Sequence, residues 1–424
     1  MSLIVQKYGG SSVADAAGIR RAAEHIVNAK MAGHSVVAVV SAMGDATDDL
    51  IDLANKISPS PPDREMDMLL SAGERISAAL VAMAVSDLGV ESRSYAGSQA
   101  GLVTDSAHRK AKVVAVRPNR IQEALGEGAV AIVAGFQGVS EEKKDITTLG
   151  RGASDVTPVA LAAAMNADYC EIYTDVDGIF SADPRIVPSA RHIPVISHEE
   201  MLELAASGSK VLMTRSVEYA RRYAIPIHVR SSFSNRQGTW VVGKDSPRWD
   251  GGVGDSSVIA VAQDRGQARV TIARIPSVPG LLARIFSILS NEGIGIDLIT
   301  QNDPGADGHV DISFTVSRED SPSAMAVLGK IKRDLRYASL LHDDRIAKIS
   351  IVGSGMSSKA GIAARIFRSL ATDNINISMI SSSDIRVSVI VSENEFARAV
   401  NTIHSEFDLA DTEGAAVVYG GTGR

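Results

Sequence analysis

Apolar and polar residues alternate over the first 240 residues in a pattern typical of short strands separated by helices. Apolar runs predict strands at 3–7, 35–41, 129–135, 169–174 and 227–230. Apolar residues at helical spacing predict helices that include 13–30, 72–88, 155–165 and 201–207. Such alternation builds a largely parallel sheet covered by helices on both faces. This part of the chain is therefore expected to be a three-layer α/β domain.

The chain beyond residue 262 contains an internal repeat. Ala283-Arg284-Ile285-Phe286 returns as Ala364-Arg365-Ile366-Phe367, 81 residues later. The same offset joins further pairs: Gly280 and Gly361, Leu289 and Leu370, Ile294 and Ile375, Ile296 and Ile377, and Ile299 and Ile380. Each copy also contains an alternating run that predicts a strand, at 309–317 and at 385–392. We expect two ferredoxin-like βαββαβ modules of about 75 residues each.

A polar, glycine-rich stretch separates these two parts of the chain. Residues 243–257 read as a linker, and Trp240 and Trp249 are expected only to pack around it. A chain of 424 residues is long enough for two or three domains. The predicted division is an α/β domain at 1–242, a linker at 243–262, a first module at 263–342 and a second at 343–424.

The composition and net charge argue against nucleic-acid and membrane partners. The net charge is −7 with 45% hydrophobic residues, so no basic surface for nucleic acid is expected. The one cysteine, Cys170, lies in an apolar strand-like run and suits a reducing compartment. No signal peptide is visible at the N-terminus, and no apolar run approaches the length that spans a bilayer. We therefore expect a cytoplasmic protein without membrane partners.

The most informative motif is Lys7-Tyr8-Gly9-Gly10-Ser11-Ser12, in which a glycine turn follows the first strand directly. Two adjacent glycines let the backbone approach a ligand closely, and free amides at the start of a helix favour an anion. Lys7 adds a positive charge at the same place. The motif therefore predicts a phosphate cradle, whereas a plain turn between strand and helix is the alternative. It is not a Walker motif, because the lysine precedes the glycines.

Two further positions carry charges suited to a small zwitterion. Arg151 stands between Gly150 and Gly152, where a guanidinium can clamp a carboxylate or a phosphate. A solvated arginine before a helix cap is the alternative. Glu74, placed near the start of an apolar helix, could receive an ammonium group, or it could only stabilise the helix dipole.

Other chemistries find no support in the sequence. Residues 174–185 begin like a calcium loop, but they lack the later acidic ligand and follow a strand. The segment fits a nucleotide-side loop better. The histidines show no metal-ligand spacing, and the chain has no HExxH motif, nucleophile elbow or GxGxxG after its first strand.

The ordered set of motifs resembles one family closely. Lys-Tyr-Gly-Gly-Ser-Ser at 7–12, Ser-Ala-Gly-Glu-Arg at 71–75, the 147–155 motif and Tyr-Thr-Asp-Val-Asp-Gly at 173–178 precede two ACT-like repeats. In this order they are similar to the bacterial aspartate kinases, of the monofunctional type resembling actinobacterial enzymes. The resemblance implies an amino-acid kinase fold followed by two ACT modules. It also implies ATP- and Mg²⁺-dependent phosphorylation of L-aspartate, the first step toward lysine (through diaminopimelate), threonine and methionine.

The resemblance assigns roles to matching positions. Lys7 would grip the transferring phosphoryl group, and Asp155 would order the catalytic charges. Arg151 would take the substrate's α-carboxylate and Glu74 its ammonium. Further residues lining the substrate pocket would be Ser41, Thr47 and Ser154. The nucleotide would be held by Tyr8, Gly9, Gly10, Ser11, Thr174, Asp175, Asp183, Arg185 and Lys210.

ACT pairs of this family bind lysine or threonine as an inhibitor. Positions that resemble the effector site are Ser277, Gln301, Asn302, Asn374, Ile375, Asn376, Ser381 and Ser382. Ser277 stands where the family usually has an acid, Ala360 where proline is usual, and Ala363 where a hydroxyl residue is common. Loss of one charge-assisted contact costs about 1.5–3 kcal/mol, a tenfold to hundredfold loss of affinity. We therefore expect weak or absent feedback inhibition. Ala153, where glycine is usual, is expected to leave activity intact.

Two other functions stay open on the sequence. One is a related kinase acting on glutamate, acetylglutamate or a nucleoside monophosphate. The other is a non-catalytic amino-acid sensor, because a fold does not guarantee an activity. The exposed edges of the ACT-like modules predict a homodimer, or a higher assembly with a shorter regulatory chain.

Overall fold

A central sheet of eight strands organises the first 242 residues. The computed structural model describes residues 2–150, 153–249, 258–354, 356, 361–411 and 417–419. The strands lie in the order β12-β14-β13-β9-β1-β2-β6-β3. Their bounds along the chain are β1 (Leu3–Tyr8), β2 (Ser35–Val40), β3 (Ser92–Tyr95), β6 (Val130–Ala134), β9 (Tyr169–Thr174), β12 (Val195–Ser197), β13 (Ile227–Ser231) and β14 (Thr239–Val242). All neighbours are parallel except β13 and β14. The predicted parallel α/β class is confirmed.

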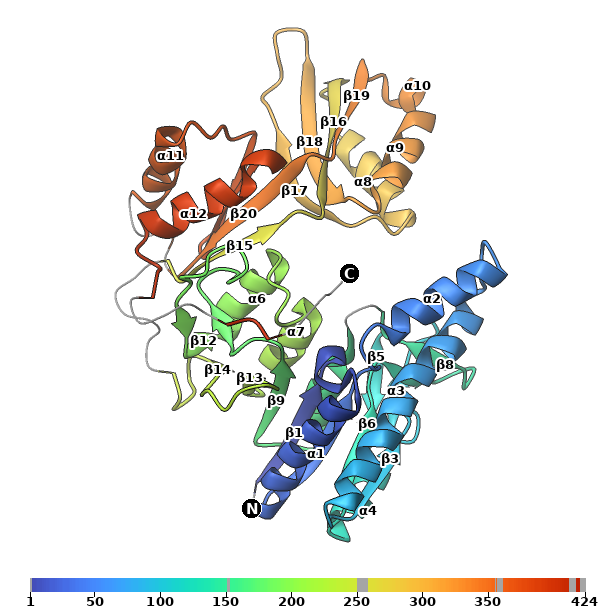
Figure 1. The fold of residues 1–424 in the computed structure, drawn as a ribbon. Helices are drawn as coiled ribbons and strands as arrows, with labels where there is room; N and C mark the ends of the chain where they lie inside the picture. Colours follow the sequence, from blue (N-terminus) through green and yellow to red (C-terminus); the bar gives the residue numbers. More distant parts are fainter. Residues whose placement is uncertain are drawn as a thin grey trace.

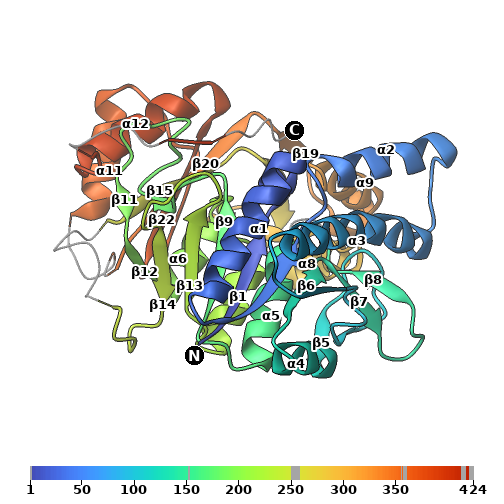
Figure 2. The same ribbon diagram turned by 60° about the horizontal axis from the view of Figure 1, so that its bottom comes forward.

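Helices cover both faces of this sheet (Figures 1 and 2). On one face, α1 (Ala16–Met31) and α3 (Asp63–Asp87) bury their apolar residues against Val36, Ala38 and Ile132. The opposite face is covered by α4 (Asn119–Gly126), α5 (Val156–Ala164), α6 (His198–Ala206) and α7 (Thr214–Arg222). The strands therefore read as continuous apolar runs, because both of their faces are buried.

Smaller elements surround the central sheet. They are α2 (Ala46–Ile57), the hairpin β10 (Ile179–Phe180) with β11 (His192–Ile193), and a four-stranded sheet of β4 (Leu102–Thr104), β5 (Val113–Val116), β7 (Gln137–Ser140) and β8 (Ile146–Thr148). Two 3₁₀ turns, η1 (Gly10–Val13) and η2 (Ala153–Asp155), precede α1 and α5. Cys170 is fully buried in β9, and this burial raises the pKa of its thiol.

The helix α3 differs from its prediction in two respects. It begins at Asp63, nine residues before the predicted start, because Met66 and Leu70 continue its buried face. Within the described residues it is also the one helix long and apolar enough to cross a membrane, so the expectation of no such run was wrong. It packs against α1 and β6 and buries the carboxylates of Asp67 and Glu74, so it is a core helix.

Two modules lie beyond the central domain (Figure 1); the first has the predicted βαββαβ order, whereas the described residues of the second run βαββα. The first contains β16 (Gln267–Pro276), α8 (Leu281–Asn291), β17 (Ile296–Gln301), β18 (His309–Ser317), α9 (Ser321–Lys330), α10 (Lys332–Leu335) and β19 (Ser339–Asp343). The second contains β20 (Ile346–Val352), α11 (Ile362–Thr372), β21 (Met379–Ser382), β22 (Arg386–Ser392), η3 (Glu393–Glu395) and α12 (Phe396–Glu406).

The fourth strand of the second sheet comes from before the first module. β15 (Ala260–Asp264) pairs antiparallel with β20, giving the order β15-β20-β22-β21. Residues 258–262, at the end of the predicted linker, are accordingly buried. The predicted domain boundaries stay a prediction. The strand β15 overlaps the end of the predicted linker.

Buried charge connects the modules with the catalytic domain. The Lys348 side chain on β20 is 1% exposed, and its Nζ forms an ion pair with Asp297 of β17. The same Nζ lies 3.5 Å from the carbonyl oxygen of Ala206, at the end of α6. Arg386 on β22 pairs with Glu203 of α6 at 3.2 Å. The second module therefore contacts α6, and Lys348 joins it to the first module as well.

We expect Asp297→Ala to destabilise this junction. The substitution leaves the Lys348 ammonium buried without its counter-charge, which costs about 2–3 kcal/mol. Thermal unfolding should therefore show a midpoint several degrees lower. The double variant D297A/K348M, which removes both charges, should recover most of that loss. Equal midpoints for D297A and the unchanged protein would contradict this account.

Candidate active site

The carboxyl ends of four neighbouring strands meet at one edge of the central sheet. The Ser41 N–H donates to the Tyr8 carbonyl oxygen at 3.0 Å, and the Gly135 N–H donates to that of Val40 at 3.0 Å. On the other side of β1, the Gly9 N–H donates to the Tyr173 carbonyl oxygen at 3.4 Å. The segments that follow β1, β2, β6 and β9 are thus joined directly. Ligands of parallel α/β sheets bind at this edge.

Lys7 and Asp155 form an ion pair at this edge. The distance from Lys7 Nζ to Asp155 Oδ1 is 2.7 Å, and the two side chains are 12% and 9% exposed. Lys7 belongs to β1, whereas Asp155 ends η2, immediately before α5. Two sequence motifs separated by nearly 150 residues therefore place opposite charges in contact. The ammonium is fixed in position where water has limited access.

The glycines after β1 keep the space beside Lys7 open. A Cβ built on Gly9 would lie 3.2 Å from Lys7 Nζ. One built on Gly10 would lie 3.1 Å from the Ala42 carbonyl oxygen and 3.2 Å from that of Gly44. Both contacts are tighter than ordinary packing, so side chains here would displace the ammonium or the adjoining loop. This geometry fits a polyphosphate chain approaching the backbone.

The amides of this cradle do not belong to the start of α1, contrary to the sequence interpretation. Asp15 caps α1, with its Oδ1 accepting from the Gly18 N–H at 2.8 Å. An acidic cap occupies that helix start and disfavours a second anion there. Tyr8 is fully buried at the end of β1, and Ser11 is an exposed residue of η1. The backbone amides beside Lys7 are therefore those of the turn itself.

Glu74 is a buried carboxylate with one oxygen unpaired. Its side chain is 2% exposed, and Oε1 accepts from the Ala42 N–H at 3.3 Å. Oε2 has no hydrogen-bond partner among the described residues. Burial raises the pKa of Glu74 from 4.5 to about 7. The helix-dipole alternative for Glu74 is wrong, because α3 begins at Asp63 and Glu74 lies far from its first turn.

Other predicted substrate residues lie near the same edge. Ser41 follows β2 directly, and Thr47 lies in the first turn of α2. Ser154 lies in η2, with its Cβ 3.8 Å from the place where Gly135 would carry one. Arg151 and Gly152 lie outside the described residues. Phe136, just after β6, holds a positive φ of 66°, a strained conformation typical of functional loops.

Four predicted nucleotide residues form one hydrogen-bonded loop after β9. Thr174 Oγ1 donates to Asp175 Oδ1 at 3.1 Å, and Arg185 pairs with Asp175 at 3.1 Å. Asp183 Oδ1 accepts from the Arg185 N–H at 2.9 Å. Lys210, by contrast, is exposed beyond the end of α6 and no ion pair joins it to these residues.

Residues near 418 also contact this loop, which sequence reasoning missed. Val418 forms an antiparallel bridge with Val176, and the Tyr419 N–H donates to the Asp175 carbonyl oxygen at 2.9 Å. The Tyr419 ring stacks on Phe233, with centroids 5.9 Å apart. No local pattern signals this contact, because its partners lie more than 180 residues away in the sequence.

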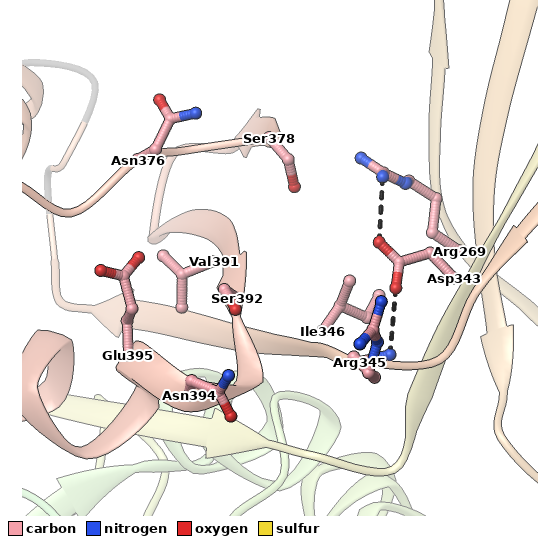
Figure 3. A pocket seen from close by; sticks show the side chains of 10 residues that line it. All are labelled: Arg269, Asp343, Arg345, Ile346, Asn376, Ser378, Val391, Ser392, Asn394 and Glu395. Atoms are coloured by element: carbon pink, nitrogen blue, oxygen red, sulfur yellow. Dashed lines mark hydrogen bonds and ion pairs between the residues drawn. The ribbon is translucent and has the colours of Figure 1, made fainter.

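A cavity of about 330 Å³ lies between the two modules (Figure 3). Arg269 and Asp343 of the first module form one wall and pair at 3.1 Å, while residues of the second module form the other. Of the predicted effector residues, only Asn376 lines this cavity. The others lie elsewhere on the modules: Ser277 after β16, Gln301 and Asn302 at the end of β17, Asn374 and Ile375 after α11, and Ser381 and Ser382 on β21.

Comparison with known proteins gives the class. A model of the amino acid kinase family matches residues 2–231, and a model of the ACT domain matches 272–330 and 349–407. The aspartokinase of Mycolicibacterium smegmatis is 54% identical over 427 residues, which cover 100% of both chains.

Two solved structures have a similar fold. The R-state complex of E. coli aspartokinase III with aspartate and ADP superposes with a TM-score of 0.82 at 25% identity, covering 96% of this chain and 100% of that one. Its T-state complex with lysine and aspartate gives a TM-score of 0.72 at 25% identity, with 96% and 99% covered.

The fold and the strand-edge site thus define a kinase of the amino acid kinase family that carries two ACT modules. Within that family the chain belongs to the aspartokinases. The family resemblance found in the sequence motifs is confirmed.

The raised pKa of Glu74 predicts a pH-dependent stability. Between about pH 4.5 and 7 the folded protein keeps a proton on Glu74 that the unfolded chain has lost. Stability from this residue is therefore present below pH 4.5 and falls by about 3 kcal/mol as pH rises through 7. Thermal unfolding across this range should show a midpoint difference between Glu74→Gln and the unchanged protein that grows with pH. A difference independent of pH would contradict the assignment.

Proposed function

We propose that the chain transfers the γ-phosphoryl group of ATP to the side-chain carboxylate of L-aspartate, giving 4-phospho-L-aspartate and ADP. The observation that carries this proposal is the Lys7–Asp155 ion pair at the same sheet edge as the buried, half-unpaired carboxylate of Glu74. The E. coli relative of the same fold binds aspartate and ADP, which supports the same ligand classes here.

The reaction needs positioning and positive charge more than a base. Aspartate's side chain has an ordinary pKa of about 3.9, so the nucleophile is ionised at neutral pH. One carboxylate oxygen forms a bond to the γ-phosphorus while the bond from that phosphorus to the bridging oxygen of ADP breaks. Lys7 stabilises the negative charge on the transferring group, and Asp155 holds the Lys7 ammonium in place.

The ammonium group and the α-carboxylate of aspartate would each pair with a residue of opposite charge, Glu74 and Arg151. Glu74 Oε2 is buried and has no hydrogen-bond partner in the part of the chain that the structure describes, and it would accept a hydrogen bond from the ammonium group of aspartate. Arg151 would take the α-carboxylate as a bidentate partner. Ser41, Thr47 and Ser154 would line the same pocket. An ammonium beside Glu74 also removes the cost of ionising this carboxylate in a buried place.

ATP would lie with its phosphates along Tyr8, Gly9, Gly10 and Ser11. The open space beside Lys7 fits that placement, because side chains at the two glycines would fill it. The rest of the nucleotide would contact Thr174, Asp175, Asp183, Arg185 and Lys210. Mg²⁺ would arrive with the nucleotide as MgATP, held by phosphate oxygens and water. Within the described residues no acidic or histidine group of three forms a metal site.

Regulation, assembly and location complete the proposal. The ACT modules would bind lysine or threonine only weakly, since Ser277 supplies no charge for an effector ammonium. A homodimer or higher assembly through the modules fits their exposed apolar residues Ile299, Leu341 and Ile380. The enzyme would act in the cytoplasm at the first step toward lysine, threonine and methionine.

A coupled assay tests the activity and its regulation together. Purified protein, MgATP and L-aspartate should give aspartate-dependent ADP release and a hydroxamate of the acyl phosphate. Lysine plus threonine at submillimolar concentration should leave the rate unchanged. Turnover with glutamate or a nucleoside monophosphate in place of aspartate would support a related kinase instead. Loss of rate with the two amino acids would refute the weak-feedback proposal alone.

Lys7 and Glu74 should affect different kinetic parameters. Lys7→Ala should lower kcat about 10²–10³-fold, because its charge acts on the transition state. Glu74→Ala should mainly raise KM for aspartate, about tenfold or more, because its charge acts on the bound substrate. Steady-state kinetics with each substrate varied would measure both. Equal changes of kcat and KM in both variants would count against this assignment.

A further inference from the structure

Helix α3 carries a second buried carboxylate on the same face as Glu74. Asp67 lies seven residues before Glu74, two helical turns away, and is 0% exposed. Unlike Glu74, both of its oxygens are hydrogen-bonded. A buried carboxylate is expensive unless it is paired in this way, so the contacts of Asp67 indicate what it holds.

Three donors from two other segments converge on Asp67. Thr148 Oγ1 donates to Oδ1 at 2.6 Å, and His108 Nδ1 contacts Oδ2 at 2.7 Å. The Arg109 N–H donates to both oxygens, at 3.1 and 3.2 Å. Thr148 ends β8, directly before the Leu149–Gly150–Arg151 segment, and is itself 1% exposed.

The same contacts stabilise a strained backbone next to Gly150. Arg109 has a φ of 63°, a left-handed conformation that is unfavourable for a residue with a side chain. Its carbonyl oxygen lies 3.1 Å from the place where a Cβ on Gly150 would be, and Gly150 has a φ of 92°. The backbone of residues 108–109 is therefore packed against the residue immediately before Arg151.

We infer that Asp67, with His108 and Thr148, positions residues 148–150, which lead directly into the proposed substrate residues Arg151 and Ser154. This inference rests on the proposed function, in which Arg151 and Ser154 contact aspartate. The single helix α3 would then position the groups that bind both ends of the substrate. Glu74 faces the ammonium directly, and Asp67 fixes the residues that lead into the one that binds the α-carboxylate. Asp67 is a positioning residue in this account, since it reaches the substrate only through those residues.

Thr148→Val removes one donor to Asp67 while the His108 and Arg109 contacts remain. We expect KM for aspartate to rise about tenfold, with kcat and KM for ATP changed less than about twofold. Thr148→Ser keeps the hydroxyl and should restore KM. The matched control is Thr315→Val. Thr315 is equally buried and accepts a backbone hydrogen bond from Leu298 at 3.1 Å, but it lies in the first module. T315V should lower stability without changing KM.

Amide hydrogen exchange provides a second readout that does not need turnover. Peptides covering 147–155 should exchange faster in T148V than in T148S or T315V, while peptides from β1 and β2 stay unchanged. Unchanged exchange in this segment, or a KM for aspartate equal to that of T315V, would overturn the inference. If the unsubstituted protein shows no turnover with aspartate, the proposed function fails, and the exchange comparison still decides whether Asp67 orders the segment.

Discussion

The parallel pairing of β1 with β2 on one side and β9 on the other determines where the site's strand-end groups lie. Parallel strands place their carboxyl ends at one edge, so the direction of the strands alone brings the turns after them together. Lys7, the Gly9–Gly10 turn and Ser41 reach that edge in this way, as does the loop from Thr174. Asp155 comes from the end of η2, immediately before α5, and α5 packs on one face of the same sheet.

Two carboxylates on α3 show how partners determine the role of a buried charge. Asp67 is bonded through both oxygens and is suited to hold a loop in place. One oxygen of Glu74 has no hydrogen-bond partner among the described residues, and burial raises the pKa of Glu74 to about 7, so a positive group beside it would stabilise the ionised carboxylate. Ionising Glu74 in this buried place costs stability, and under the proposed function the ammonium of aspartate would offset that cost on binding. The two proposals thus assign structural order and ligand binding to residues two turns apart on one helix.

Much of the fold follows from local pattern, and the rest from long-range pairing. Five of the eight central strands, the repeat and the Lys7 to Ser12 turn were predictable, because period and turn chemistry act within a few residues; β3, β12 and β14 were not predicted. The start of α3 was missed because the charged Asp67 lies on the buried face between Met66 and Leu70, and the position of Glu74 within the helix was missed with it. The contacts of Asp67 and of Tyr419, and the pairing of β15 with β20, join residues far apart in sequence and leave no local signal.

The crossing strand β15 imposes an order on folding during synthesis, because its partner β20 is made later. Asp264 leaves the ribosome roughly 80 residues before Ile346, the first residue of its partner β20, a delay of about 4–16 s at ordinary elongation rates. Through that interval the first module can assemble from its own contiguous strands, while β15 waits with an unpaired edge. The catalytic domain, already complete in sequence, is thereby tied to the last-made module, so a chain halted between the modules would expose an edge that recruits other chains.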